Sequence, residues 1–531
     1  MQFLDSRKGA HPFHRRDASR PHIFVFTMDM VAPEFYRRPS PYAAHLHKPA
    51  WDRLEQDSVC FDNAFSVSPL CGPSRAALFT GRYPYILVNE ERAHDGSEVE
   101  VRPDDPIYPQ YLRKAGYKLG HVGKSHIGTE KFMQAFGESC SPWNRWAPPL
   151  YDDPEYHQYL KTKGIGNFRV KREIRGLRAD RRTAGNHYGG WIEQADGRDF
   201  PVEGTYPHYL VDRALATLDS LHRRQTDGGP LYLHVDLFAP HQPFMIPAGM
   251  ERREAELRKH LTLPDGYVRW LNNGCCPLGP EPGIYEMYRR NWGLYDEETA
   301  YDYLIAHILQ MEVIDLALAR FVQRLQEWGL YDDSVLIFTA DHGEMNLEKG
   351  LIDKGVYGHP KVARVPLLFK QPGNQAGGRK VDQPVCLLDV APTLLQYAGI
   401  EPLARLDGES LLRRLSDQDR GREKPVIFEA GWHIAPNPAV AIHWYRGRDT
   451  HYRYVYNLCS DVDELYDLND PEARNRIDDP ALSTVRKQMI VQMRDILNGD
   501  PRWRCYRQAF ELEKELDLPS RLGDNQMFIP E

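Results

Sequence analysis

The chain has 531 residues, and this length predicts one large domain and a smaller one. Its hydrophobic fraction of 41% and charged fraction of 27% are those of a globular protein. A net charge of −8 excludes a basic field that would attract nucleic acid, and no run of about eighteen apolar residues predicts a membrane span. The eight cysteines follow no zinc or disulfide spacing, and the N-terminus lacks a signal-peptide core, so we expect a reduced, cytoplasmic protein.

Short runs of β-branched and aromatic residues predict buried parallel strands at residues 22–29, 117–122, 231–241, 334–342 and 365–370. Amphipathic helical patterns lie between them, most clearly at 207–224 and at 300–329, which ends at Gly329. Strands alternating with helices predict an α/β domain over residues 22–402, after an N-terminal arm at 1–21. We expect a large, mostly parallel sheet sandwiched by helices.

The segment at about 126–205 is rich in Gly, Pro, Trp and Tyr and has little periodicity. It predicts a long excursion over the surface, where substrate-recognition loops are usually found. Its aromatic residues suit stacking on a sugar or aryl group and loop packing equally well. The basic run at 169–182 within it is interpreted as a solvated surface stretch.

The pattern changes after Gly399. Antiparallel strands at 424–430, 439–447 and 451–458 and a helix near 480–497 predict a smaller C-terminal α+β domain at 403–499. The polar tail at 500–531 carries no strong fold signal, and it suits either a homo-oligomer arm or a loose end.

Polar residues stand where the predicted strands of the large domain end. They are Asp29, Lys124, His126, His241, Asp341 and His342. Ligands of open α/β sheets bind at the carboxyl ends of the strands, so we expect these side chains to share one rim. A single Asp or His in such a place is usually a cap or a structural residue, but so many together predict a site.

Two carboxylates and an imidazole, from Asp29, Asp341 and His342, suit one divalent cation such as calcium or manganese. Lys124, His126, His241 and Lys354 would add cationic or proton-donating groups around this cation. A metal among such groups predicts a pocket for an anionic tetrahedral group such as sulfate or phosphate.

The stretch SPLCGPSRAALFTG at 68–81 places Cys71 at the start of a predicted helix, with Pro73 in its first turn and Gly81 at its end. The helix N-terminus favours negative charge there, and Arg75 lies one turn on. The residues alone leave a nucleophilic thiolate and a buried core cysteine open.

The motif Cys-x-Pro-Ser-Arg followed by Ala-Ala-Leu-x-Thr-Gly closely resembles the signature of the type I sulfatases, in the alkaline phosphatase superfamily. Further blocks resemble that family in order: FTMD at 26–29, GKSH at 123–126, HQP at 241–243, ADHGE at 340–344, DKGVYGHPKVARVPLLF at 353–369 and DELYDLNDPEARN at 463–475. The resemblance is strong over 22–402 and looser over 425–497. It implies an alkaline phosphatase-like fold.

The resemblance also implies a mechanism. A formylglycine-generating enzyme would convert Cys71 to formylglycine, whose hydrated aldehyde attacks sulfur with one hydroxyl and expels sulfate with the other. Arg75 would stabilise the formylglycine oxygen, and Lys124 and Lys354 would hold sulfate oxygens. His241 would donate a proton to the leaving alcohol, and His126 would assist turnover of the hydrated formylglycine, the hemiacetal side of the reaction. The implied metal site consists of Asp29, Cys71, Asp341 and His342. The implied substrate is a small sulfate ester or a sulfated sugar.

Three positions depart from the family pattern. Met30 follows Asp29 where many members have an acid or amide, and His342 stands where some have Asn. Both changes weaken the preference for Ca²⁺ relative to Mn²⁺. His359 stands in a block where a Tyr-Glu pair is common, and we expect a solvent-facing structural histidine there.

Three rival functions fit the same residues. A phosphonate monoester or phosphodiester hydrolase shares the formylglycine motif and a single Asp followed by a non-acid, but Lys124 with His126 is the sulfatase arrangement. The others are a glycan-binding protein without activity and a phosphatase that uses an unmodified Cys71. We expect a sulfatase, because each key position carries a chemically competent group.

Overall fold

The computed structural model describes residues 20–515 apart from 38–39, 41, 87–100, 102–104, 138–139, 151, 179, 225–227, 403–405, 417–424, 446–450, 459, 461 and 471. The predicted arm at 1–21 and the end of the tail after residue 515 therefore lie almost wholly outside the described residues. The boundary at 402/403 adjoins an undescribed segment, so the division into domains stays a prediction.

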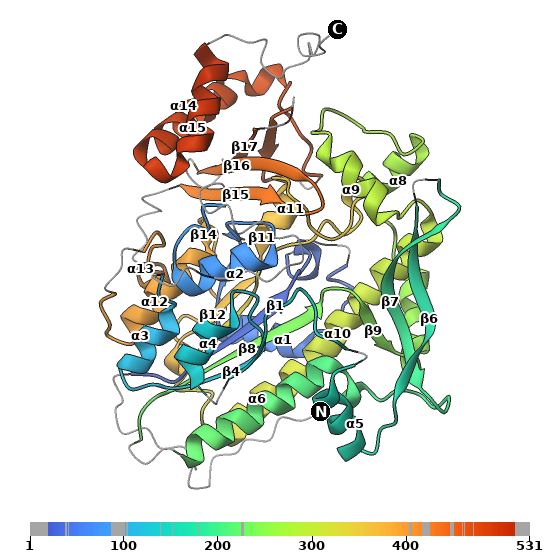
Figure 1. Cartoon of the computed structure of the whole chain (residues 1–531), viewed down its shortest axis with the longest axis vertical. Helices are drawn as coiled ribbons and strands as arrows, with labels where there is room; N and C mark the ends of the chain where they lie inside the picture. Colours follow the sequence, from blue (N-terminus) through green and yellow to red (C-terminus); the bar gives the residue numbers. More distant parts are fainter. Residues whose placement is uncertain are drawn as a thin grey trace.

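An eight-stranded sheet forms the centre of the molecule (Figure 1). Its strand order is β13-β2-β12-β10-β1-β8-β4-β5, with β13 (Lys380–Val381) at one edge. Five neighbouring strands pair in parallel, namely β10 (Val335–Ala340), β1 (Ile23–Asp29), β8 (Leu231–Pro240), β4 (Lys118–Lys124) and β5 (Cys140–Trp143). Every residue of β1, β8 and β10 is buried, as expected for strands covered on both faces. The predicted mostly parallel sheet is confirmed.

Helices cover both faces of this sheet. The main ones are α1 (Pro49–Asp57), α3 (Tyr108–Lys114), α4 (Thr129–Phe136), α6 (Tyr206–Arg223), α10 (Glu297–Glu327) and α12 (Val390–Tyr397). A Cβ at Gly120 would meet Thr217 of α6, whereas the ring of the next residue, His121, packs on Phe132 of α4. Since neighbouring residues of a strand point to opposite faces, α6 and α4 lie on opposite sides. None of the described helices combines the length and apolar character needed to cross a bilayer.

Residues 365–370 form strands, as predicted, but the predicted parallel direction was wrong. The structure divides it into β11 (Arg364–Val365) and β12 (Leu367–Lys370), and β12 pairs antiparallel with both β10 and β2 (Val59–Phe61). A parallel neighbour needs a crossover, usually a helix long enough to return the chain to the other end of the sheet. Here the chain after β10 stays at the carboxyl rim and turns back directly.

The segment at 126–205 is more regular than the sequence predicts. It contains α5 (Pro154–Thr162) and a long hairpin of β6 (Phe168–Leu177) and β7 (Ala184–Gln194), to which β9 (Phe244–Pro247) adds a third strand. The exposed face of β6 holds much of the basic run, and Arg169 and Arg172 pair with Glu193 and Glu254 at 2.7 and 2.6 Å. Charged side chains replace the apolar alternation that would have indicated a strand.

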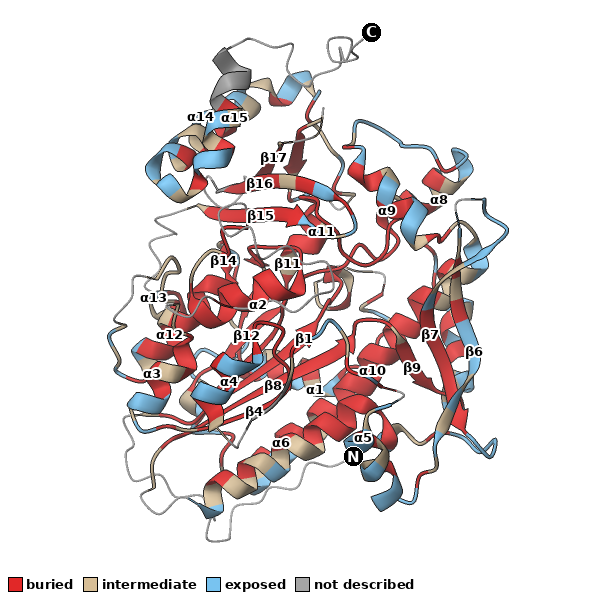
Figure 2. Ribbon diagram, in the orientation of Figure 1, coloured by how far each residue is buried: buried red, intermediate tan, exposed pale blue. Residues whose placement is uncertain are grey.

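The predicted C-terminal α+β region is confirmed as an antiparallel sheet with helices. Its elements are β15 (Val426–Trp432), β16 (Pro436–Tyr445), β17 (His451–Asn457), β18 (Glu464–Asp467), α14 (Ser483–Gly499) and α15 (Arg504–Glu515). Ile427 packs with Met489 of α14, whereas Phe428 packs with Phe65 and Met345 of the large domain. The sheet is thus buried on both faces. Figure 2 shows its strands mostly red, between helices α14 and α15 on one side and the large domain on the other.

The start of the tail is folded, which the sequence analysis missed. Trp503, Tyr506 and Phe510 are at most 2% exposed and pack under β16 and β17 with α14. Their spacing of three and then four residues is that of one helix face, but a charged residue follows each of them directly and hides the apolar pattern. The Trp503 ring also lies 5.6 Å from that of Tyr83, which joins the tail to the segment after α2 (Cys71–Thr80).

The packing of the tail predicts a large stability effect. Trp503→Ala is expected to lower the free energy of unfolding by about 3–5 kcal/mol, because it removes a fully enclosed indole and leaves a cavity. Urea unfolding followed by circular dichroism measures this. Trp146→Ala, at an indole that is 44% exposed, is the control, with an expected change of about 0.5 kcal/mol or less. Equal effects of the two substitutions would contradict the packed tail.

Candidate active site

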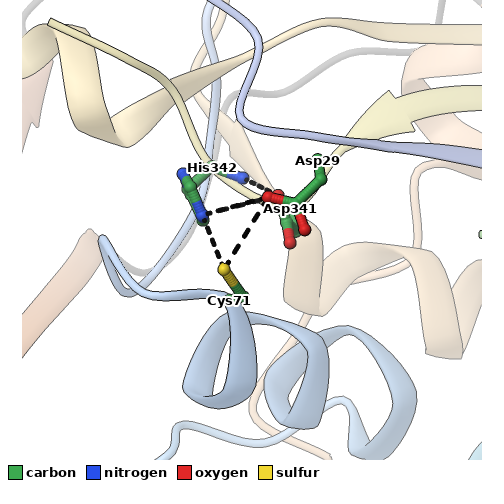
Figure 3. Close-up of side chains that lie close together, drawn as sticks. All are labelled: Asp29, Cys71, Asp341 and His342. Carbon is green, nitrogen blue, oxygen red and sulfur yellow. Dashed lines mark hydrogen bonds and ion pairs between the residues drawn. The ribbon is translucent and has the colours of Figure 1, made fainter. Parts of the chain in front are cut away.

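Four side chains from three separate segments meet at the carboxyl rim of the sheet (Figure 3). Asp29 is the last residue of β1, Cys71 is the first residue of α2, and Asp341 and His342 follow β10 directly. All four are completely buried, and one potential ligand atom from each lies within 4.8 Å of the others. The structure therefore brings together the four residues predicted to form the metal site.

The side chains of this cluster point toward one another. Cys71 Sγ lies 3.2 Å from His342 Nε2 and 3.7 Å from Asp29 Oδ1. His342 Nε2 lies 3.7 Å from both Asp29 Oδ1 and Asp341 Oδ1. His342 Nδ1 donates a hydrogen bond to the carbonyl of Gly343 at 2.9 Å, so Nε2 is the ring nitrogen that faces the cluster.

Helix α2 holds Cys71 in place. Leu70 before the helix has an extended backbone, and Gly81 ends the helix with φ 67°, a left-handed conformation that favours glycine. Ser74 donates a hydrogen bond to the carbonyl of Asp341 at 2.5 Å, which ties the first turn of the helix to the loop after β10. Ser74 N–H donates to the carbonyl of Leu70 at 3.0 Å and Pro73 has no N–H, so the N–H groups of Cys71 and Gly72 stand at the helix start, where an anion is favoured.

Arg75 lies buried under the cluster and contacts three carboxylates. Its Nε donates to Asp341 at 2.8 Å, its Nη1 donates to Asp236 at 3.0 Å, and its Nη2 lies 3.6 Å from Asp29. Burial opposes the charged form, but these carboxylates raise the pKa of Arg75 above its ordinary value. Arg75 is thus a fixed positive charge one helical turn from Cys71.

Two lysines from different segments of the chain lie beside the cluster. Lys124, the last residue of β4, donates a hydrogen bond to Asp29 Oδ2. Lys354 Nζ lies 3.1 Å from Asp353 and 2.5 Å from His241 Nε2, and its charge acts on both Cys71 and Asp29. An anion that binds over Cys71 would therefore meet two ammonium groups.

His241 is uncharged in this arrangement. Its Nδ1 contacts the carbonyl of Gln242 at 2.6 Å, which only a protonated nitrogen can do, so Nε2 accepts from Lys354. Burial, with the charges of Lys354 and Lys124, holds the pKa of His241 well below its usual range. The shared proton of the pair therefore lies on Lys354.

The remaining predicted residues lie as follows. His126 is buried two residues beyond Lys124, with φ 54°. Met30 contributes its backbone N–H, which donates to Asp341 Oδ1 at 3.1 Å. His359 was predicted to face solvent, but it is completely buried and accepts a hydrogen bond from the N–H of Lys361 at the start of α11 (Pro360–Ala363). The prediction was wrong because a capping role draws the ring inward.

The sequence analysis missed a layer of charged groups behind the cluster. Asp236 on β8 binds Arg75 and also lies 2.8 Å from His121 Nε2 on β4. Asp353 binds Lys354, and Gln242 donates a hydrogen bond to it. A usable signal was present, since Asp236 and His121 interrupt apolar strands, where a charged residue needs a partner.

The sulfatase family model matches residues 22–400, which is most of the chain and includes every residue of the site. The chain belongs to the sulfatase family. A second model, for the C-terminal region of N-sulphoglucosamine sulphohydrolase, matches residues 347–498 of this sulfatase. The resemblance of the motifs to the type I sulfatases is thereby confirmed.

Individual relatives agree with this membership. The sulfatase is 27% identical to the choline-sulfatase of Rhizobium meliloti, over 90% of this chain and 86% of the relative. Its fold matches a phosphonate monoester hydrolase from Silicibacter pomeroyi with a TM-score of 0.67 at 21% identity, covering 89% and 94% of the two chains. A protein solved with its substrate D-glucosamine-2-N,6-O-disulfate matches with a TM-score of 0.60 at 16% identity, over 95% and 100%. Membership supports hydrolysis of a sulfate ester or a phosphonate monoester.

The cluster fits the divalent metal that sulfatases use. Two carboxylates and one imidazole nitrogen point to one place, and residue 71 lies beside them. Burial lowers the pKa of His342, but Asp341, Cys71 and Asp29 raise it to about 9, so the cluster stabilises positive charge. A cation in this place would replace that proton.

Proposed function

We propose that this sulfatase hydrolyses a sulfate monoester to an alcohol and sulfate, through a formylglycine made from Cys71 and one divalent metal. The observation that carries the proposal is the position of Cys71. It is the first residue of α2 and lies 3.2 Å from His342 and 3.7 Å from Asp29, within a motif that a formylglycine-generating enzyme would read. The substrate would be a small sulfate ester or a sulfated sugar.

Asp29, Asp341, His342 and residue 71 would hold the metal. The carboxylates favour Ca²⁺, and the imidazole together with Met30 in place of a further oxygen ligand makes Mn²⁺ the alternative. Bound there, the metal would act as a Lewis acid on the sulfate group and favour an ionised hydroxyl at position 71.

The other residues supply charge, position and a proton. Arg75, held by three carboxylates, would stabilise oxygen charge at position 71 without moving. Lys124 and Lys354 would bind sulfate oxygens. As the S–O bond of the substrate breaks, the alcohol oxygen would take a proton from the Lys354–His241 pair, with His241 in position to pass it on. A hydrated aldehyde at position 71 supplies two hydroxyl groups, one that attacks sulfur and one that later expels sulfate.

Two measurements test the proposal on protein from a host that makes formylglycine. Mass spectrometry of the peptide that contains Cys71 is expected to find an aldehyde in the active enzyme. Steady-state rates on paired phenyl sulfate and phenyl phosphonate esters are expected to give the higher kcat/KM for the sulfate. An intact thiol in fully active protein would refute the formylglycine mechanism.

A phosphonate monoester hydrolase is the second candidate. Met30 favours it, because a non-acid after the first metal aspartate is a feature of that neighbouring group. Lys124 followed by His126 argues for sulfate. A much higher kcat/KM on the phosphonate would overturn the sulfatase assignment and leave the same site with a different substrate.

The Lys354–His241 pair predicts a dependence on the leaving group. His241→Gln is expected to lower kcat/KM about 10²–10³-fold for an alkyl sulfate, whose alkoxide needs a proton, and less than about tenfold for 4-nitrophenyl sulfate. The ratio of the two substrates is the measurement. His359→Asn, at a buried histidine that caps α11 and whose replacement can also cap it, should leave the ratio unchanged. Equal losses on both substrates would exclude proton donation.

A further inference from the structure

An exposed tryptophan lies beside the proton-donating pair. Trp146 follows β5 and is 44% exposed, although its ring centroid is only 5.8 Å from that of His241 and 6.4 Å from that of Phe238. Phe238 in turn stacks on His241 at 5.2 Å with an angle of 29°. The three rings form one aromatic wall, of which His241 and Phe238 are buried and Trp146 reaches solvent.

The wall lies where the leaving alcohol must be. An alcohol oxygen that receives the proton lies within about 3 Å of His241 Nε2 or Lys354 Nζ. The carbon framework attached to that oxygen then comes within reach of the Trp146 ring, whose centroid is 5.8 Å from that of His241. A ring on the alcohol can place its flat face or edge against the indole at the 4.5–7 Å spacing that such pairs favour.

The charges around the wall select against a cationic alcohol. The positive charges of Lys354 and Lys124 act on His241 against the single negative charge of Asp353, and Lys124 Nζ lies 5.8 Å over the ring of Phe238. Arg145, directly before Trp146, is exposed and adds a further positive charge. A quaternary ammonium group would therefore meet like charges where an aromatic wall alone would attract it.

We propose that Trp146 is a specificity-determining residue and that the leaving alcohol carries a neutral ring, aryl or sugar, that packs on the exposed indole. A single exposed tryptophan is unremarkable on a protein surface, but this one packs against His241, which would pass a proton to the leaving alcohol. The proposal rests on the proposed sulfate-ester hydrolysis and names the kind of alcohol that it releases.

The test compares variants on four esters: phenyl sulfate, glucose 3-sulfate, ethyl sulfate and choline sulfate. Trp146→Ala is expected to lower kcat/KM about 10–100-fold for at least one ring ester and less than about threefold for ethyl sulfate, since only a ring uses the indole. Trp146→Phe should recover most of the loss. Leu316→Ala, which removes an apolar side chain that is 46% exposed on α10, is the control and should change neither. Whichever ring ester loses more identifies an aryl or a sugar alcohol.

Other outcomes decide against the proposal. Equal losses on ring esters and ethyl sulfate would show that Trp146 only supports the fold around His241. Choline sulfate as the best substrate, with the largest loss in Trp146→Ala, would refute the neutral ring. Should the unmodified protein hydrolyse no sulfate ester but cleave phosphonate monoesters, the proposed function fails. The same comparison of phenyl and ethyl phosphonate esters then judges Trp146 independently.

Discussion

Replacing Cys71 with serine is expected to stop multiple turnover, with kcat falling by at least about 10³-fold. A serine hydroxyl can attack sulfur at the same helix N-terminus, but it has no second hydroxyl to expel the sulfate. The variant should therefore accumulate one covalent sulfate per chain. Steady-state assays on an aryl sulfate and intact-protein mass spectrometry after incubation with substrate measure the two effects.

A second cysteine offers the matched control. Cys386 is also completely buried, but it belongs to a separate apolar cluster with Phe65 and Leu388. Cys386→Ser should keep its turnover and carry no sulfate. Full activity in the Cys71→Ser variant would mean that neither the aldehyde nor the thiol takes part in the reaction.

Replacing Asp341 with asparagine is expected to abolish metal binding and to lower kcat by about 10³-fold or more. Asp341 Oδ1 accepts the N–H groups of His342 and Met30 at 2.9 and 3.1 Å, and Oδ2 accepts from Arg75 at 2.8 Å. These bonds aim the carboxylate at the cluster. Elemental analysis after dialysis should find one ion per chain in the unmodified protein and close to none in the variant.

The Asp236→Asn variant distinguishes the effect of losing the metal from the effect of losing a carboxylate partner of Arg75. Asp236→Asn removes another buried carboxylate of Arg75 but no member of the metal cluster, so the bound ion should remain. Both variants should lose about 3–5 kcal/mol of unfolding free energy, because each leaves Arg75 with one counter-charge fewer. If Asp236→Asn also lost the ion, the metal would depend on residues beyond the predicted four.

Local patterns predicted the main elements and the site residues. The apolar runs at 22–29 and 231–241 are strands because parallel strands buried on both faces are apolar along their whole length. Asp29, Lys124 and Asp341 could be assigned to one rim because the carboxyl ends of parallel strands share an edge. The sequence alone also identified Cys71 and Arg75, since their spacing is a property of one helix start.

Local sequence patterns could not predict the features that depend on contacts between distant segments. The antiparallel direction of β12, the β6–β7 hairpin and the packed helix α15 follow from which segments pair, and pairing is decided by the whole chain. Burial likewise turned the expected surface residue His359 into an internal cap.

The charge states and ion pairs of the site also depend on how distant segments pack together. Sequence patterns predicted an α/β fold with Cys71 at a helix start and charged residues at the strand ends, and the motifs predicted membership of the sulfatase family. Only the tertiary structure revealed that Asp236 holds Arg75, that Lys354 donates to His241, and that the Trp146 ring lies 5.8 Å from that of His241. The reason is physical: a motif sets which groups are available, whereas their charge states and contacts depend on what packs around them.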